Sequence, residues 1–375
     1  MIEKLFKANK QWGSRDRGFI AETVYDMVRH WRLINTVNGN DFTQPNPKYF
    51  DALLQVYLFL IKEQEYYFEW QTRLDKAKIL ENYKKAQNQA EVLYSVPNWI
   101  HQKGNNQYGN TWLNELKSLN EPAPLVIRIN TLKNSLKNIE DQLTEEEVVF
   151  AESEVTPNAL ILQKRINVFA TELFKEGFVE VQDEGSQVIG DFCKVKPGMR
   201  VIDACAGAGG KSMQLAALME NKGKLIAMDV EQWKLDECKK RARRAGAFNI
   251  EPRLIEGSKT IKKLENSADV VLLDVPCTGT GVLRRNPDAK WKLNPEFLEK
   301  VKTMQYEIFR DYSKMVKPGG HLIYSTCSIF MDENQHQVEV FLKENAGFMV
   351  EEEKILTPFM NGTDGFYMVR LKRNA

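Results

Sequence analysis

The chain has 375 residues, of which 43% are apolar and 27% charged, and its formal net charge is +1. This length allows two or three globular domains, and the near-neutral charge does not by itself indicate a nucleic-acid partner. Because no stretch reaches the roughly 18 uninterrupted apolar residues of a membrane span, and residues 1–10 lack the apolar core of a signal peptide, we expect a cytoplasmic protein.

Residues 1–105 are predicted to form a helical domain. Apolar residues over 20–37 recur at steps of three and four, which is typical of one face of an amphipathic helix. A more apolar helix is expected over 51–62 and a polar one over 70–94. The stretch 38–47, rich in Asn, Gly and Pro, separates the first two helices.

Residues 106–190 are predicted to form a small α/β module. Two short runs of β-type residues, 125–130 and 159–162, flank a segment that favours a helix over 135–143.

Residues 191–375 are predicted to form a domain in which strands and helices alternate. The apolar strand candidates are 200–205, 224–230, 253–256, 269–275 and 321–326. A helix is expected over 294–317, because Asn294 can cap it and Pro318-Gly319-Gly320 can end it. This alternation predicts an α/β fold with a mainly parallel, doubly wound, Rossmann-like sheet.

A glycine-rich segment, Asp203-Ala-Cys-Ala-Gly-Ala-Gly-Gly-Lys211, follows the first of these strands and is called the glycine loop below. Glycines at such a turn let the backbone approach a ligand. The spacing of Gly207, Gly209 and Gly210 is not the GxGxxG of dinucleotide-binding folds, which argues against a nicotinamide-dependent oxidoreductase. Cys205 stands where an ATP-binding P-loop needs its first glycine. A tight turn without a ligand is the alternative.

Asp229 lies at the end of the second strand, about twenty residues after the glycines, where an acid can bind the hydroxyls of a ribose. This combination fits adenosine cofactors in general and does not choose between a dinucleotide and S-adenosylmethionine. Taken alone, Asp229 is equally well explained as a solvated acid at a strand end.

Two cysteine motifs, Asp274-Val-Pro-Cys277-Thr-Gly-Thr-Gly281 and Ser325-Thr-Cys327-Ser328, also follow apolar strands. The carboxyl ends of parallel strands share one edge of a sheet, so we expect these motifs beside the glycine loop. A buried cysteine is more often inert than nucleophilic, but this setting favours a nucleophile. The five cysteines form no CxxC pair, and only four histidines are present, so reduced thiols and no metal site are expected.

These motifs resemble those of the Sun/Fmu-type RNA cytosine-5 methyltransferases, most densely in DACAGAGGK, LLDVPCTGTGVLRRNPDAKW and STCS. Arg128-Ile-Asn130 and 181–186 are similar to the family's RNA-binding module, which is ferredoxin- or RRM-like, and to its junction with the catalytic domain. The helix over 15–34 is similar to the NusB-like domain of the ribosomal small-subunit methyltransferase B type, although that domain is shorter here. The resemblance implies S-adenosylmethionine as cofactor and 16S ribosomal RNA as substrate. A tRNA substrate, or a non-catalytic RNA-binding assembly factor, is the alternative.

The resemblance also implies catalytic roles. Cys327 would attack cytosine C6 as a thiolate, and Asp274 would hydrogen-bond the N3/N4 edge of the base. Cys277 would assist release of the enzyme after C5 has been methylated, and Lys211 would reach the active site. DNA cytosine-5 methyltransferases use the Pro-Cys cysteine as nucleophile, so the presence of Cys327 indicates RNA.

The same resemblance implies a cofactor site in which Asp229 binds the ribose. The other expected cofactor contacts are Cys205, Ala206, Gly207, Ala208, Gly209, Gly210, Lys211, Ser258 and Asp274. The family usually has an acid near the adenine, where this chain has Ser258, and a proline where it has Ala208. A serine can still form a hydrogen bond at that position.

RNA contacts are expected from basic side chains. Arg284, Arg285 and Lys290 follow the Pro-Cys motif and could hold phosphates, and Arg128 could do so in the small module. The basic run 239–244 is better explained as a solvated helix face. The target cytosine must be unstacked, at a cost of about a few kcal/mol, so a loop or single strand is the favoured substrate. We expect a monomer.

Overall fold

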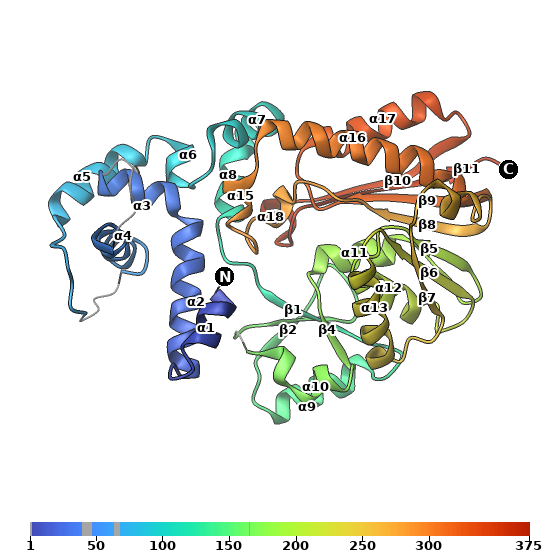
Figure 1. Ribbon diagram of the computed structural model, residues 1–375, viewed down its shortest axis with the longest axis horizontal. Helices are drawn as coiled ribbons and strands as arrows, with labels where there is room; N and C mark the ends of the chain where they lie inside the picture. The colour runs from blue at the N-terminus through green and yellow to red at the C-terminus, as the bar shows by residue number, and fades with distance from the viewer. Residues whose placement is uncertain (1, 40–46, 64–67, 165) are drawn as a thin grey trace. The chain divides into compact units, whose positions relative to one another are not determined.

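The computed structural model describes residues 2–39, 47–63, 68–164 and 166–375, which divide into two compact units (Figure 1). One unit comprises residues 1–121 together with 283–294, and the other comprises 122–282 together with 295–375. None of the helices in these described ranges is long and apolar enough to cross a membrane.

The first unit is helical. Its helices are α1 (Ile2–Ala8), α2 (Ser14–Arg29), α3 (Trp31–Asn38), α4 (Pro47–Leu60), α5 (Lys76–Ala86), α6 (Ala90–Leu93), α7 (Asn98–Tyr108), α8 (Trp112–Leu119) and α15 (Ala289–Lys292). The helix predicted over 20–37 is two helices, because His30 leaves helical geometry with φ −100° and ψ 18°. The helix predicted over 70–94 is also two, and the first begins after the cap Asp75. Most of the predicted separator 38–47 lies outside the described residues.

This unit extends beyond the predicted domain 1–105 in two respects. The helices continue to Leu119, so the predicted boundary falls inside α7, and the segment 283–294 joins this unit from far along the chain. Hydrogen bonds hold that segment, among them one from Lys290 Nζ to the Arg29 carbonyl at 2.7 Å and one from Trp291 Nε1 to the Val28 carbonyl at 3.0 Å. They give partners to carbonyls at the end of α2, which lack them within the helix.

The second unit contains two sheets. The smaller has the strand order β2-β3-β1-β4. Its strands are β1 (Leu125–Ile129), β2 (Phe150–Glu152), β3 (Ala159–Leu162) and β4 (Val179–Val181), and its helices are α9 (Leu136–Glu145) and α10 (Glu172–Lys175). The pairs β1–β3, β1–β4 and β2–β3 are antiparallel, and Ile127, Ile139 and Leu160 lie in the core between strands and helices. The strands predicted over 125–130 and 159–162 and the helix between them are confirmed.

The larger sheet has the order β10-β11-β9-β8-β5-β6-β7. Its strands are β5 (Arg200–Asp203), β6 (Lys224–Asp229), β7 (Ile250–Leu254), β8 (Ala268–Asp274), β9 (Val316–Thr326), β10 (Phe348–Leu356) and β11 (Phe366–Arg373). Strands β7, β6, β5, β8 and β9 are parallel, as predicted, and β11 is antiparallel to both of its neighbours. The predicted helix 294–317 ends earlier, at Tyr312, because β9 already begins at Val316. Pro318-Gly319-Gly320 therefore lies inside β9 and does not end a helix.

Helices cover both faces of this sheet (Figure 1). On one face are α11 (Glu184–Phe192), α12 (Gly210–Leu218) and α13 (Gln232–Ala245), and on the other are α14 (Ser258–Lys262), α16 (Pro295–Tyr312) and α17 (Gln335–Glu344), while α18 (Pro358–Asn361) precedes β11. Successive side chains of a strand point to opposite faces of the sheet. In β5, Val201 packs against the helices of the first face and Ile202 against those of the second. After β5 the chain continues into α12 on one face of the sheet, and after β8 it continues toward α16 on the other face. Ligands are expected at the carboxyl ends of two such adjacent strands.

Candidate active site

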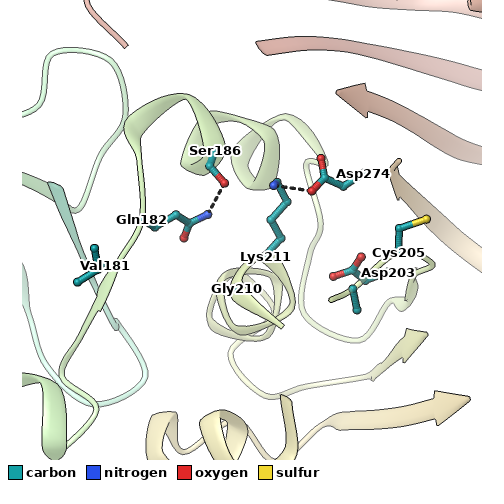
Figure 2. Close-up of a pocket in the computed structure, with 9 residues that line it drawn as sticks. Val181, Gln182, Ser186, Asp203, Cys205, Gly210, Lys211 and Asp274 are labelled. Carbon is teal, nitrogen blue, oxygen red and sulfur yellow. Dashed lines mark hydrogen bonds and ion pairs between the residues drawn. The ribbon is translucent and has the colours of Figure 1, made fainter. Parts of the chain in front are cut away.

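A pocket of about 130 Å³ lies at the carboxyl ends of β5 and β8 (Figure 2). It is lined by Val181, Gln182, Ser186, Asp203, Cys205, Ala206, Gly210, Lys211 and Asp274. These residues come from the end of β4, the start of α11, the glycine loop and the end of β8. The predicted glycine loop and the predicted Asp274 thus meet at one edge of the sheet, and the small module contributes a wall.

Backbone geometry shapes the glycine loop. Gly207 and Gly209 have φ of 55° and 86°, in the left-handed region that favours glycine. A side chain at Gly209 would come within 2.6 Å of Cys238 Sγ, whereas one at Gly207 would meet nothing within 4 Å. The Gly207 amide donates to Asp229 Oδ2 at 3.0 Å, which ties the loop to the end of β6. The loop is therefore packed on one side and open at Gly207.

Lys211 and Asp274 form an ion pair inside the pocket. Lys211 extends from the first turn of α12, and its Nζ lies 2.7 Å from Asp274 Oδ2 (Figure 2). Ser325 Oγ donates to the other oxygen, Asp274 Oδ1, at 3.1 Å. Burial alone lowers the pKa of Lys211, but the charge of Asp274 and the hydrogen bond to it raise that pKa above its usual value. Lys211 therefore remains an ammonium donor at neutral pH.

The two motif cysteines face each other. Cys277 Sγ and Cys327 Sγ lie 3.1 Å apart, and both side chains are half-buried. The hydrogen bond to Cys327, together with burial, raises the pKa of Cys277 well above its usual range. Cys277 therefore keeps its proton at neutral pH and can donate it toward the sulfur of Cys327.

A buried acid, Glu333, connects the two cysteine motifs. Its side chain is 0% exposed, and it accepts hydrogen bonds from the Thr278 amide at 2.8 Å and the Thr278 hydroxyl at 2.6 Å. Ser328 Oγ and Gln305 Nε2, the latter at 3.1 Å, also donate to it. Glu333 was missed in the sequence, because an acid in a polar segment is usually solvated and no local pattern marks it as buried.

Two glycines bring the backbones of the motifs into contact. The Gly281 amide donates to the Cys327 carbonyl at 2.9 Å, and the Gly365 amide donates to the Gly281 carbonyl at 2.8 Å. A Cβ at Gly281 would lie 2.1 Å from the Gly365 carbonyl oxygen. Only glycine permits this approach, so Gly281 sets the spacing between the Pro-Cys loop and the Thr-Cys loop.

The residues at this edge fit S-adenosylmethionine. Asp203 lines the pocket, and its Oδ1 is buried and has no hydrogen-bond partner among the described residues, so it can accept from an ammonium group. Burial raises the pKa of Asp203 to about 6, and a nearby cation would favour its charged form. The start of α12 offers amides to a carboxylate, and Asp229 has acceptor sites for ribose hydroxyls.

A second pocket, of about 490 Å³, lies beyond Asp229 in the chain. It is lined by Val230, Ile255, Glu256, Gly257, Ser258, Ile261, Lys262, Glu265, Asp311, Tyr312 and Lys314. Ser258, the predicted adenine contact, is therefore on a concave surface. Burial, together with the nearby carboxylates of Asp311 and Asp229, raises the pKa of Tyr312 to about 12. Tyr312 was not singled out in the sequence, because it lies within an ordinary helical pattern.

The predicted RNA-binding residues are less accessible than expected. Arg128 is 5% exposed, and its guanidinium donates to Gln182 and to the Gly210 carbonyl at 3.0 Å. Lys290 is 3% exposed and donates to the Arg29 carbonyl and to the side chain of Asn120. We therefore withdraw the phosphate contacts expected of Arg128 and Lys290, because protein groups engage both cations.

The other two expected contacts remain predictions. Arg284 is buried and Arg285 half-buried, and both belong to the segment 283–294 of the helical unit. No described contact of either residue bears on RNA.

Two family models match this chain. One, described as 16S rRNA methyltransferase RsmB/F, matches residues 192–372, and the other, described as the ferredoxin-like domain of the RsmF/B-like methyltransferases, matches residues 96–169. The first covers the larger sheet with both cysteine motifs. The second covers the first three strands of the smaller sheet, for which a ferredoxin-like fold was expected.

Individual relatives cover more of the chain. The probable ribosomal RNA small subunit methyltransferase B of Bacillus subtilis is 30% identical in an alignment of 300 positions that covers 75% of this chain and 67% of that protein. The ribosomal RNA small subunit methyltransferase B of Shewanella oneidensis is 31% identical in an alignment of 300 positions that covers 76% of this chain and 68% of that protein. The crystal structure of PH0851 has a TM-score of 0.84 and 26% identity, and the match covers 99% of this chain and 93% of that one. A methyltransferase homolog from Pyrococcus horikoshii shares the fold, with a TM-score of 0.68 and 23% identity over 76% of this chain and 97% of that one.

Proposed function

Because the chain belongs to the RsmB/F family of S-adenosylmethionine-dependent RNA methyltransferases, we propose that it methylates cytosine C5 in 16S ribosomal RNA through a covalent bond between Cys327 and cytosine C6. The observation that carries this proposal is the distance of 3.1 Å between Cys327 Sγ and the protonated thiol of Cys277. Asp274 stands at the end of β8, which pairs with β9, and its partner Lys211 extends toward it from α12.

The first step is addition to the base. Cytosine C5 is a poor nucleophile, and a thiolate of Cys327 that bonds to C6 moves an electron pair toward C5 and N3. The Cys277 thiol, whose pKa is raised, donates a hydrogen bond that stabilises negative charge on the Cys327 sulfur. Asp274 accepts from the cytosine N4 amino group. The Lys211 ammonium, 2.7 Å from Asp274, supplies the positive charge that offsets the electron density at N3.

S-adenosylmethionine supplies the electrophilic methyl group that the nucleophilic C5 takes up. Three groups would hold it. Asp203 offers an acceptor oxygen without a partner among the described residues, Asp229 lies at the end of β6 beside the glycine loop, and the start of α12 offers backbone amides. Ser258 would contact the adenine from the second pocket.

The last step is release of the enzyme. A base removes the proton from C5, the electron pair of that C–H bond re-forms the C5–C6 double bond, and the C6–S bond breaks. Cys327 departs as a thiolate. The neighbouring Cys277 thiol stabilises it by a hydrogen bond, so the adduct should persist when Cys277 is absent.

Single cysteine substitutions test this mechanism. Cys327→Ala should abolish methyl transfer to ribosomal RNA, and Cys277→Ala should accumulate a protein–RNA adduct that survives denaturing electrophoresis. Cys193→Ala is the matched control, because Cys193 is a buried thiol at the end of α11, outside both motifs, and should do neither. Full activity of Cys327→Ala, or a persistent adduct in the double variant Cys277→Ala/Cys327→Ala, would overturn the assignment of the nucleophile.

The substrate part of the proposal rests on the relatives, whose names specify small-subunit ribosomal RNA. It predicts that bisulfite sequencing of 16S ribosomal RNA finds a 5-methylcytosine that disappears when the gene is deleted. If the deletion instead removes a 5-methylcytosine from tRNA, the substrate is tRNA and not ribosomal RNA. Absence of S-adenosylhomocysteine binding in calorimetry would favour a non-catalytic assembly factor.

A further inference from the structure

We propose that three charged side chains, Arg128, Glu180 and Arg241, position the glycine loop, so that the ferredoxin-like module forms part of the cofactor site. This inference rests on the proposed function only in its assignment of the cofactor to the glycine loop. It gives Arg128 a role in the cofactor site in place of the RNA contact that its sequence position first indicated.

The three side chains come from three elements, and two of them donate hydrogen bonds to the glycine loop. Arg128, on β1, donates to the Gly210 carbonyl at 3.0 Å. Arg241, on α13, donates through Nη1 to the Ala208 carbonyl at 3.2 Å and through Nη2 to Glu180 Oε2 at 2.9 Å. Glu180 lies on β4. Two strands of the module therefore hold two carbonyls of the glycine loop, that of Gly210 directly and that of Ala208 through Arg241.

Burial strengthens these contacts. Arg128 and Glu180 are 5% and 3% exposed, so water competes little for their hydrogen bonds. Burial lowers the pKa of Arg128 to about 10, which leaves the guanidinium charged at neutral pH. The second oxygen of Glu180 pairs with Arg244, whose guanidinium lies 3.8 Å from the ring centroid of Phe174 on α10. Glu180 is thus anchored on both oxygens and can hold Arg241 in one orientation.

The held carbonyls determine where amides point. A trans peptide is planar, and its C=O and N–H groups point in opposite directions. Fixing the carbonyls of Ala208 and Gly210 therefore fixes the N–H groups of Gly209 and Lys211, at the start of α12. Glycine-rich segments have many accessible conformations, so a loop already held in one conformation loses less entropy when it binds the cofactor. The expected effect is on cofactor affinity and not on the chemistry at C5.

The test compares variants of Arg241 with a matched control at the same junction. Lys133 donates to the Glu176 carbonyl at 2.6 Å and to the Arg244 carbonyl at 3.0 Å, so it joins the module to the end of α13 without touching the glycine loop. Calorimetry with S-adenosylhomocysteine on the full chain should show about tenfold weaker binding for Arg241→Met, equivalent to about 1.4 kcal/mol, and unchanged binding for Lys133→Met. Arg241→Lys should fall between wild type and Arg241→Met, because it keeps the charge and loses the two-pronged geometry.

Kinetics separates positioning from catalysis. In Arg241→Met, KM for S-adenosylmethionine should rise, while kcat at saturating cofactor and KM for RNA stay unchanged. Glu180→Gln, which keeps the shape and removes the charge, is the second variant if Arg241→Met does not fold. Wild-type affinity for S-adenosylhomocysteine in a folded Arg241→Met or Glu180→Gln protein would overturn this inference. The proposed function fails independently, if wild type binds S-adenosylhomocysteine but Cys327→Ala still methylates RNA.

Discussion

Replacing Glu333 with Ala should separate the two cysteine motifs. Glu333 receives hydrogen bonds from Thr278, beside Cys277, and from Ser328, beside Cys327, and its side chain is fully buried. In the alanine variant these donors lose their common acceptor, and a cavity replaces the carboxylate. We expect the two sulfurs, now 3.1 Å apart, to move away from each other and lose their hydrogen bond.

The magnitude follows from the contacts. A hydrogen bond to a charged group contributes roughly 1.5–3 kcal/mol, and leaving buried donors unpaired costs about 1–3 kcal/mol for each. Because four donors lose this acceptor while the chain can relax and admit water, we expect Glu333→Ala to lower the free energy of unfolding by about 3–5 kcal/mol. Glu333→Gln should lose only about 1–2 kcal/mol, since the hydroxyls of Thr278 and Ser328 can rotate and accept from the new amide.

The rate of methyl transfer should fall as well as the stability. A misplacement of about 1 Å in a reacting group can cost on the order of a hundredfold in rate, so kcat of Glu333→Ala should fall by about that factor. Affinity for S-adenosylhomocysteine should not change, because the donors to Glu333 among the described residues belong to Thr278, Gln305 and Ser328, outside the glycine loop.

Three measurements test this reasoning: urea unfolding, kcat at saturating substrates, and calorimetry with S-adenosylhomocysteine. Glu339→Ala is the control, because it removes an exposed carboxylate from α17. If Glu333→Ala kept both the kcat and the unfolding free energy of this control, the idea that Glu333 aligns the two motifs would be refuted.

Four further outcomes are expected. Gly281→Ala should lower the free energy of unfolding by about 1–3 kcal/mol and reduce methylation, because its Cβ would lie 2.1 Å from a backbone oxygen; an unchanged melting temperature would contradict this. Burial lowers the pKa of Lys290 from 10.5 to about 7, so the unfolded chain binds more protons between these values and stability should rise with pH across that window. Lys290→Met should remove on the order of a few kcal/mol from this rise in the free energy of unfolding, as measured by urea unfolding at several pH values. Parallel pH profiles of the wild type and the variant would contradict the lowered pKa of Lys290. Asp229→Ala should weaken S-adenosylhomocysteine binding by about tenfold to a hundredfold in calorimetry, equivalent to about 1.4–2.8 kcal/mol. Ser258→Ala should weaken it by less, about tenfold at most, and no effect would remove Ser258 from the cofactor site.

Local sequence patterns were sufficient for the parallel strands β5, β6 and β8, whereas the strand predicted over 253–256 begins earlier, as β7 (Ile250–Leu254). Strands β5, β6 and β8 are covered by helices on both faces, so they appear as continuous apolar runs followed by glycine or acid. Strands β10 and β11 were both missed. The exposed segment of β10 contains three consecutive glutamates, 351–353, and resembles solvated chain. Its pairing with β11 stabilises it, and such pairing between distant residues leaves no local pattern.

The residues of the site also divide into those that a local motif predicts and those that only the packing of distant segments brings to the site. Cys277, Cys327 and Asp274 each follow a strand in a distinctive short motif, and the topology of a parallel sheet brings such positions to one edge. Glu333 and Tyr312 have no such motif. Their positions at the site depend on how η5 (Met331–Glu333) and the end of α16 pack against the sheet.

The sequence by itself determined the doubly wound sheet, the edge at which the chemistry gathers and the identity of the motif residues, because strand periodicity and turn residues are local properties. The tertiary structure alone decided which cations are available to a ligand. Arg128 and Lys290 look like surface cations in the sequence, yet both are buried against carbonyls from segments more than eighty residues away. A long cationic side chain is exposed or buried according to what distant segments pack around it, and no pattern of neighbouring residues records that.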